Sequence, residues 1–581
     1  MSPHDGMMKL IGVICALALL LPLSGCVDEW PIAKDVYTTA EQQVIPVPVP
    51  AGTKQIAPAE VSQYKTLGYG AWTAGPGTNY SLDPKNPRPY DKRVELAPGH
   101  TDATGAARLL SFFSITDIHI TDKESPGLAM YVGSSVEYGA SPQFQAYYSP
   151  TVLATTQVLD AAIQTVNALH KRTPFDFGIS LGDDTNCTQY NELRWFIDVL
   201  DGKVITPSSG AHDGADKIDY QKPFKAAGLD KAIPWYQTLG NHDQFWQGGA
   251  LENVKTMQAH IGNTVFNMDI NNLAMPASVD TYGTYMGVVD GSTPYGDVIK
   301  TGLEETYEVP PTVVADPDRH SLATFESSSL NWMSEFFKTT SKPVGHGFSQ
   351  ANLDADFASY SFEPKSGIPL KIIVLDDTCK GEGQPNFAAG CLDNARSTWL
   401  KNELAEGQNN GKLMIIAAHI PLLPQTSITD TTIVPLSVMN DTQLLSDLHA
   451  YPNLLLWISG HRHVSVVTPQ PSADPSAPEQ GFWEVETSSL RDFPQQFRTF
   501  DIRRNTDNTI SIFVTNVDPA VREGSPAAKS RAYGIGVKEI FGAYPYFSPG
   551  DPTSEAYNAE LVKVLTPQMQ TIIATCGTPL E

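Results

Sequence analysis

The chain is poor in basic residues and has only one long apolar run. Its 581 residues include 39 Lys and Arg against 64 Asp and Glu, a formal net charge of -25. A field of that sign repels nucleic-acid backbones and argues against a DNA or RNA binder, but it does not disfavour cationic ligands such as metals. One apolar run excludes a multi-span membrane protein. The 44 Gly and 44 Pro show no collagen period, and with 41% hydrophobic residues a sizeable core is expected.

Cysteine is also scarce, with six residues and no CxxC spacing that would suggest a thiolate metal site. Cys15 and Cys26 belong to the N-terminal segment. The other four are Cys187, Cys379, Cys391 and Cys576. Four cysteines allow more than one pairing, and the sequence alone cannot choose among them. Cys379 and Cys391 flank a glycine-rich loop and are the predicted pair.

The N-terminus has the pattern of an export signal. Lys9 precedes an apolar run over 10–21 that is too short to span a bilayer comfortably, and Pro22 ends it. Leu-Ser-Gly-Cys at 23–26 resembles a bacterial lipobox, in which residues 1–25 are removed and Cys26 is lipidated. An ordinary signal peptide that ends near a Cys is the alternative. We expect an extracytoplasmic lipoprotein anchored to a membrane through Cys26, the outer one if the cell is Gram-negative.

Composition and periodicity divide the remainder into three regions. Residues 26–105, rich in Pro and Gly, are expected to form an extended tether and a loop-rich lead-in. In 106–517, short apolar runs alternate with helical stretches and predict an α/β domain. Residues 518–581 are expected to form a loop and one helix. The predicted strands are 109–116, 177–181, 233–239, 370–375, 413–418 and 454–459, with a hairpin over 497–517; the predicted helices are 152–171, 190–200 and 395–404.

Polar segments follow five of these strands. They are Asp117-Ile118-His119, Gly182-Asp183-Asp184-Thr185-Asn186, Gly240-Asn241-His242-Asp243, His419 and Gly460-His461-Arg462-His463. In open α/β sheets ligands bind beyond the carboxyl ends of the strands, so these segments should meet at one rim. Alternate residues of an extended segment point the same way, so Asp117 and His119 can bind one ion together. Carboxylates, an amide oxygen and imidazoles suit Mn, Fe or Zn.

Each segment alone is a weak signal. A DxH or HxH pair arises by chance in many proteins, and an Asp at a strand end is often a helix N-cap. The set is stronger than its parts, because the segments occur in sequence order at strand ends and hold five of the 13 histidines.

Together the segments resemble the calcineurin-like metallophosphoesterase superfamily, with its motifs D-x-H, G-D-x-x-D/N, G-N-H-D/E, a lone H and G-H-x-H. The resemblance implies a four-layer α-β-β-α sandwich of two mixed sheets. It also implies two divalent ions (Mn, Fe or Zn), with Asp183 bridging them. One ion is expected to take Asp117, His119, Asp183 and His463, and the other Asp183, Asn241, His419 and His461.

The resemblance also implies a mechanism. Two close cations acidify a shared water, and the resulting hydroxide attacks phosphorus. His242 is expected to contact the phosphate and protonate the leaving alkoxide, with Asp243 orienting its ring. Purple acid phosphatases have Tyr at the position of Asn186, so this chain is closer to the phosphodiesterase-like branch, where that position orients the site by hydrogen bonds.

The chain is longer than a compact member of that family requires. Asn241 and His419 are 419 − 241 = 178 positions apart, so residues 244–369 are expected to form an insertion that acts as a cap or side wall. Within it, Arg319 either contacts substrate or lies in a surface turn. Arg462 either faces the phosphate or faces solvent. Asp376 and Asp377 either support the site or form a plain turn.

The expected function is hydrolysis of a phosphodiester or phosphomonoester. A 5′-nucleotidase-like or phospholipid-cleaving hydrolase on the same scaffold is the first alternative. A non-enzymatic surface lipoprotein that retains the fold is the second, and it predicts missing ligands, whereas every motif position is filled.

Overall fold

The computed structural model describes residues 28–80, 88–135, 145–269, 283–323, 331–379, 387–422, 441–542 and 557–580. The signal peptide and Cys26 lie outside these ranges. Within them, no helix combines the length and the apolarity that crossing a bilayer requires.

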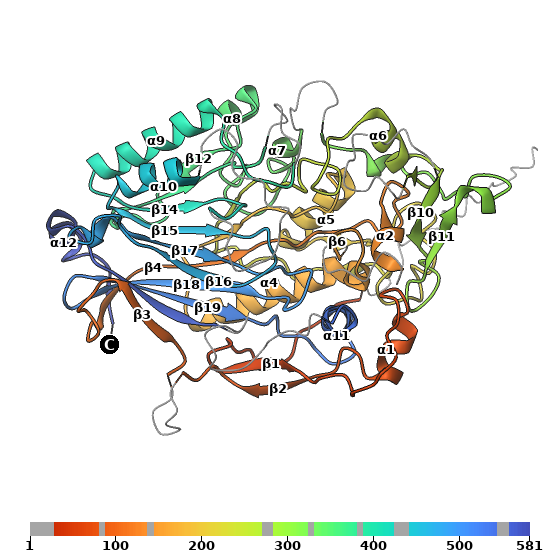
Figure 1. Cartoon of the computed structure of the whole chain (residues 1–581), viewed down its shortest axis with the longest axis horizontal. Coiled ribbons are helices and arrows are strands. Elements are labelled where there is room, and N and C mark those ends of the chain that lie inside the picture. The colour runs from red at the N-terminus through yellow and green to blue at the C-terminus, as the bar shows by residue number, and fades with distance from the viewer. Residues whose placement is uncertain are drawn as a thin grey trace, which may run out of the picture.

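The fold is mixed α/β and is built on two large mixed sheets (Figure 1). The eight-stranded sheet has the order β3-β20-β19-β18-β4-β5-β8, with β21 also paired to β4. Its strands β4, β5 and β8 are parallel, whereas β18 and β19 form an antiparallel hairpin beside them. The bounds are β3 (Asp91–Leu96), β4 (Gly105–Ile115), β5 (Phe177–Ser180), β8 (Trp235–Gln237), β18 (Phe497–Asn505), β19 (Ile510–Val517), β20 (Ala559–Lys563) and β21 (Thr578–Pro579).

The six-stranded sheet has the order β12-β13-β14-β15-β17-β16. Its four central strands are parallel, and the two edge strands run antiparallel to them. The bounds are β12 (Tyr360–Phe362), β13 (Leu370–Val374), β14 (Leu413–Ala417), β15 (Leu454–Ser459), β16 (Val466–Gln470) and β17 (Phe482–Glu486). All six strands predicted from apolar runs form, as does the predicted hairpin.

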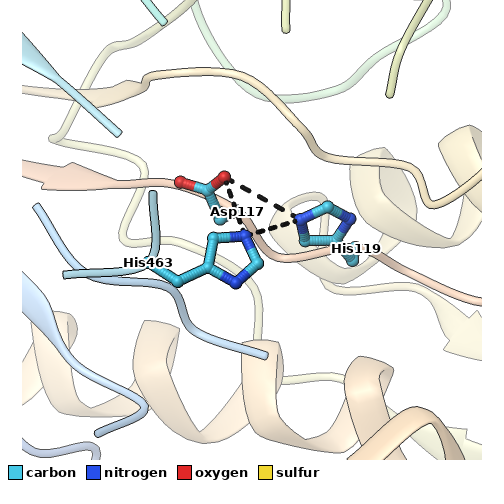
Figure 2. Close-up of side chains that lie close together, drawn as sticks. All are labelled: Asp117, His119 and His463. Atoms are coloured by element: carbon cyan, nitrogen blue, oxygen red, sulfur yellow. Dashed lines mark hydrogen bonds and ion pairs between the residues drawn. The ribbon is translucent and has the colours of Figure 1, made fainter. Parts of the chain in front are cut away.

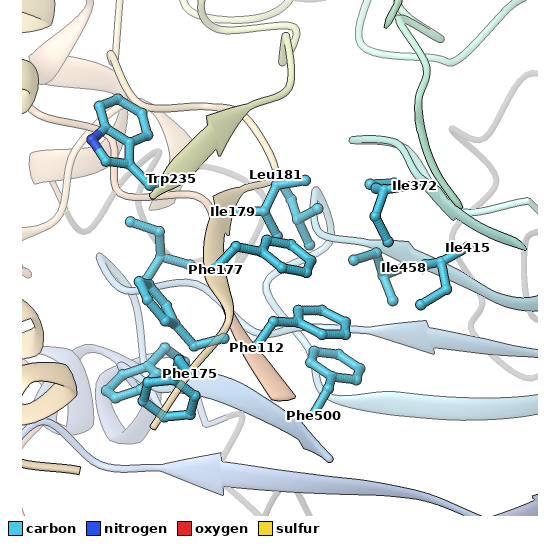
Figure 3. Packing of buried hydrophobic residues seen from close by; sticks show 14 of the residues in the cluster. Phe112, Phe175, Phe177, Ile179, Leu181, Trp235, Ile372, Ile415, Ile458 and Phe500 are labelled. Atoms are coloured by element: carbon cyan, nitrogen blue, oxygen red, sulfur yellow. The ribbon is translucent and has the colours of Figure 1, made fainter. Parts of the chain in front are cut away.

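One hydrophobic core joins the two sheets. Phe112 of β4 stacks between Phe177 of β5 and Phe500 of β18, with ring centroids 4.7 and 4.6 Å apart. Ile415 and Ile458, from β14 and β15 of the other sheet, belong to the same buried cluster (Figure 3). Burial of both sheets explains why their central strands are nearly continuous apolar runs.

Helices cover the sheets. Helices α4 (Thr155–Arg172) and α5 (Tyr190–Leu200) bury apolar side chains in the shared core. Helices α9 (Asn394–Asn409) and α10 (Asp441–His449) pack on the six-stranded sheet through a second cluster, and Figure 1 shows them together at one outer side. The predicted helices 152–171, 190–200 and 395–404 correspond to α4, α5 and α9.

The flanking segments add smaller elements. Residues 26–105 include β1 (Gln42–Pro46) paired with β2 (Trp72–Pro76), α1 (Val61–Leu67) and β3, and residues 518–581 include α11 (Pro526–Ile540), β20 and α12 (Pro567–Ile573). Further short elements are α2 (Met130–Ser134), β6 (Val204–Ile205) and β7 (Phe224–Lys225).

The predicted insertion holds a three-stranded sheet of its own. The order is β11-β10-β9, and Figure 1 shows α6, β10 and β11 near one another at one end of the molecule. The bounds are α6 (Val254–Ile261), β9 (Asn267–Met268), β10 (Thr284–Val289), β11 (Val298–Leu303), α7 (Trp332–Glu335) and α8 (Gln350–Ala355).

The predicted cysteine pair lies close together. Contact with the Cys391 side chain and burial raise the pKa of the Cys379 thiol. Both are free thiols in the structure, so the predicted disulfide was wrong.

Candidate metal centre

The ends of strands from both sheets converge on one cluster of His and Asp side chains. Two groups of predicted metal ligands have ligand atoms that all lie within 4.8 Å of one another, and a third group joins His119 and Asp183 to His242. The first follows β4 and β15, and the second follows β5, β14 and β15. Their members are Asp117, His119 and His463, and Asp183, His419 and His461.

The first group is compact. The Nε2 atoms of His463 and His119 lie 3.2 and 3.8 Å from Asp117 Oδ1 and 3.1 Å from each other (Figure 2). His119 Nε2 is also 3.7 Å from Asp183 Oδ2. One of these two nitrogens must carry a proton to hydrogen-bond the other, whereas one cation can take the lone pairs of both. The separations suit ligands about 2 Å from one ion.

Asp183 of the second group also lies beside His119 of the first. His419 Nε2 lies 3.2 Å from Asp183 Oδ2 and 2.9 Å from Asn241 Oδ1, and His461 Nδ1 lies 3.1 Å from that same amide oxygen. Asp183 Oδ2 therefore stands between the two sets of imidazoles. All seven side chains predicted as metal ligands lie in this cluster.

In both Asp117 and Asp183, one carboxylate oxygen accepts hydrogen bonds from the surrounding protein and the other oxygen faces the imidazoles of the cluster. Asp117 Oδ2 accepts hydrogen bonds from Thr116 Oγ1 at 2.7 Å and from the backbone N–H of His461 at 2.9 Å, whereas the buried Oδ1 has no hydrogen-bond donor. Asp183 Oδ1 accepts from the backbone N–H of His242 at 2.8 Å. A buried carboxylate oxygen without a donor is costly unless a cation faces it, so this donor set fits a metal ion.

Outer partners determine which atom of His463, His419 and Asn241 faces the cluster. His463 Nδ1 contacts Asp492 Oδ2 at 2.8 Å, and His419 Nδ1 donates to the Leu181 carbonyl at 2.8 Å. Asn241 Nδ2 donates to the Gly248 carbonyl at 3.0 Å, which directs Oδ1 inward. Asp377 accepts the backbone N–H of His419 at 3.3 Å, so it supports the site. Such outer contacts orient metal ligands.

Asp492 provides a direct test of this orientation. Burial opposes its charge, but Arg491 and His463 hold the pKa of Asp492 well below its usual range. Asp492→Ala is expected to weaken metal affinity about 10–100-fold, because His463 loses the acceptor that orients its ring. Competition with a metal chelator measures this. Asp507→Ala removes a similar contact, 2.8 Å to His100 near the surface, and is the matched control. Equal affinities in the two variants contradict the prediction.

The backbone at the candidate ligands is unusual. Asp117, His119, Asp183, His461 and His463 have φ of 51, 46, 55, 76 and 58°. Non-glycine residues in such conformations cost about 1–3 kcal/mol each and concentrate at functional sites.

A motif glycine allows the backbones to approach. A Cβ at Gly240 would stand 2.2 Å from both the backbone N and Oδ1 of Asp183. No larger residue fits there unless the backbone or the candidate bridging carboxylate moves.

His242 lies beside the cluster, its ring centroid 4.4 Å from that of His119. Its Nδ1 donates to the Asn186 carbonyl at 2.8 Å. Burial lowers the pKa of His242, against an opposing effect of Asp183. Its backbone carbonyl accepts from Thr188 Oγ1 at 3.2 Å.

Asp243 does not orient that ring, so this expectation was wrong. Its carboxylate accepts the backbone N–H groups of Asp183 at 2.9 Å, Thr185 at 3.0 Å and Gly240 at 3.0 Å. The turn after β8 directs it against those donors, and it holds two metal-motif loops together. Burial and the nearby Asp183 raise the pKa of Asp243 to about 7.

The two candidate arginines make internal ion pairs. Arg462 Nε donates to both oxygens of Glu486, at 2.9 and 3.1 Å. Arg319 is only 1% exposed, and its Nε donates to Asp122 at 3.1 Å and to Ser209 at 3.0 Å. The expected surface turn does form, as the short 3-10 helix Pro317–Arg319 between exposed neighbours, but the guanidinium of Arg319 is buried against a carboxylate.

Sequence reasoning missed Arg491. It is buried, and its guanidinium donates to Asn186 Oδ1 at 3.3 Å and to the Gln145 carbonyl at 2.9 Å. Asn186 thus connects Arg491 with the ring of His242. Residues 487–492 follow β17 as the other motifs follow their strands, so recognition of β17 was the signal that could have found Arg491.

Comparison with known proteins adds little. No family model matches the chain, and no curated protein matches it. Among solved structures, it is similar to the crystal structure of a dimetal phosphatase from Danio rerio, with 10% identity, 71% of this chain and 100% of that chain covered, and a TM-score of 0.36. Because a likeness of this degree carries no functional argument, the assignment of chemistry rests on the side chains themselves.

Proposed function

We propose that this chain is a metal-dependent phosphate-ester hydrolase with a dinuclear centre. The observation that carries the proposal is the position of Asp183 Oδ2, 3.2 Å from His419 Nε2 on one side and 3.7 Å from His119 Nε2 on the other. A carboxylate oxygen between two sets of imidazoles is what a pair of mutually repelling cations requires. Together with the sequence motifs, this position of Asp183 supports membership of the calcineurin-like superfamily and, with it, the four-layer sandwich of two mixed sheets.

The proposed ligands form two sets, one for each ion, and Asp183 belongs to both. One ion is held by Asp117, His119, Asp183 and His463, and the other by Asp183, Asn241, His419 and His461. When bound, such a pair supplies an acidified water as nucleophile and neutralises the charge of the phosphate. The protein orients His463, His419 and Asn241 through their outer partners.

His242 is the proposed proton donor to the leaving group. Since Nδ1 donates to the Asn186 carbonyl, Nε2 is the ring nitrogen that exchanges a proton. The negative charge of a bound phosphate raises the pKa of His242, which burial lowers in the free protein. Arg491, through Asn186, helps to hold this arrangement.

The role of His242 predicts a dependence on the leaving group. His242→Ala is expected to lower the rate of hydrolysis of esters with alkyl leaving groups by a factor of about 10²–10⁴, because an alkoxide needs a proton as it departs. The rate of hydrolysis of p-nitrophenyl esters should fall much less, because their phenolate departs readily without a proton. Measured kcat/KM for both substrate types checks this. His320→Ala alters an exposed histidine and is the control. An equal loss for both leaving groups refutes the role of His242.

Comparing bis(p-nitrophenyl) phosphate with p-nitrophenyl phosphate, each with Mn, Zn and Fe, tests the proposed function. Turnover of either ester that depends on the metal supports the hydrolase, and the ratio distinguishes diesterase from monoesterase. No turnover of either ester with any metal favours the non-enzymatic alternative.

We also propose that the enzyme acts outside the cytoplasm, tethered to a membrane by acyl chains on Cys26 and acting on small phosphate esters rather than nucleic acid. The lipobox-like segment at 23–26 and the net charge of -25 support this.

A further inference from the structure

A second cluster of metal-ligating side chains lies apart from the proposed dinuclear centre. It consists of Cys187, Glu252 and His260, whose exposed fractions are 0, 6 and 0% and whose ligand atoms all lie within 4.8 Å of one another. We propose that these residues bind a structural Zn²⁺ ion that fastens helix α6 to the loop after β5. This site goes beyond the proposed hydrolase and does not depend on it.

The distances suit one tetrahedral ion. His260 Nε2 lies 3.7 Å from Cys187 Sγ and 3.2 Å from Glu252 Oε1. Zinc with bonds of about 2.3 Å to sulfur and about 2.0 Å to nitrogen and oxygen has tetrahedral edges of about 3.5 Å for S···N and about 3.3 Å for N···O. Thiolate, imidazole and carboxylate are all ligands that zinc takes in proteins.

The atoms in contact argue against a hydrogen-bonded nucleophile–His–acid triad. In such a triad, one ring nitrogen contacts the nucleophile and the other contacts the acid. Here the single atom His260 Nε2 faces both Cys187 Sγ and Glu252 Oε1, and Nδ1 instead lies 3.3 Å from Ser125 Oγ. One ring N–H could serve both groups only as a shared and weakened hydrogen bond, whereas one cation can bind all three atoms.

Each proposed ligand also has an outer partner. Cys187 Sγ accepts the backbone N–H of Gln247 at 3.4 Å, and the second carboxylate oxygen of Glu252 accepts the hydroxyl of Thr256. Nδ1 of His260 forms a hydrogen bond with Ser125 Oγ at 3.3 Å. Outer contacts of this kind orient metal ligands. The burial of all three side chains favours a structural role.

The location defines what the ion connects. Cys187 directly follows Asn186, whose carbonyl accepts the Nδ1 proton of His242. Glu252 and His260 belong to the predicted insertion, and His260 is on α6. The ion therefore joins the insertion to the loop that positions the proposed proton donor.

Cobalt substitution tests the site in the full-length chain. No candidate ligand of the dinuclear centre is a thiolate, so a near-ultraviolet thiolate-to-cobalt charge-transfer band reports only on a cysteine site. We expect this band in the wild type and in Asp183→Asn, where the dinuclear centre is disabled. It should disappear in Cys187→Ser but persist in the matched Cys379→Ser/Cys391→Ser variant. A wild type without the band, or a band that survives Cys187→Ser, overturns the proposal.

Metal content gives a second readout that does not depend on activity. Adding Cys187→Ser to Asp183→Asn should lower the zinc content by about one ion per chain. Circular dichroism confirms that each variant is folded before its metal is counted. Unchanged zinc content in the folded double variant overturns the proposal. Loss of hydrolysis in Asp183→Asn with the cobalt band retained separates this site from the dinuclear centre.

Discussion

Asp183→Asn is expected to lower phosphate-ester hydrolysis about a thousandfold or more, equivalent to ~4 kcal/mol of transition-state stabilisation. The amide can still accept the backbone N–H of His242 through one oxygen, so the local fold should remain. What disappears is the anionic Oδ2 that stands between the imidazoles of His119 and His419. Steady-state kinetics and metal content measured on the same preparation check this.

The neighbouring Asp184 offers a matched control. It is also fully buried, and burial together with Asp243 raises its pKa well above the usual range. Both of its oxygens accept hydrogen bonds from Ser180 and Gln237 and neither faces the imidazole cluster, so Asp184→Asn should retain most of the activity. Near-wild-type hydrolysis in Asp183→Asn, or equal losses in both variants, contradicts the bridging role of Asp183.

Removal of divalent ions should abolish essentially all hydrolysis, because the described cluster offers imidazoles and carboxylates but leaves the nucleophile and charge neutralisation to the ions. Mn, Zn or Fe should restore it. Elemental analysis in the Cys187→Ser background, where the separate cysteine site is disabled, should find about two ions per active chain. Full activity in chelated, metal-free protein contradicts a metal-dependent mechanism.

Much of the scaffold could be predicted, because the strands that carry the ligands are short apolar runs buried on both faces. Such apolar runs form β4, β5, β14 and β15, and a polar segment follows each of them. The rule that ligands gather beyond the carboxyl ends of strands then placed Asp117, Asp183 and His419 together, as the structure does.

Strand β17 could not be predicted in the same way. Its sequence FWEVE carries Glu484 and Glu486, which interrupt the apolar pattern. Their burial depends on partners such as Arg462 that only the fold provides. Missing β17 also meant missing Arg491, which follows it. The contacts of Asp243 escaped prediction for a related reason, since they depend on the path of a turn rather than on residue spacing.

The two halves of the candidate centre come from different sheets. Asp117, Asp183 and Asn241 follow strands of the eight-stranded sheet, and His419 and His461 follow strands of the six-stranded one. Ions bound here would cross-link the two layers, in addition to the apolar core and the hydrogen bonds that already join them. Ligands that bind only the native state protect it from unfolding. The supply of metal in the surrounding compartment would then govern how long each molecule survives proteolysis, as well as how fast it works.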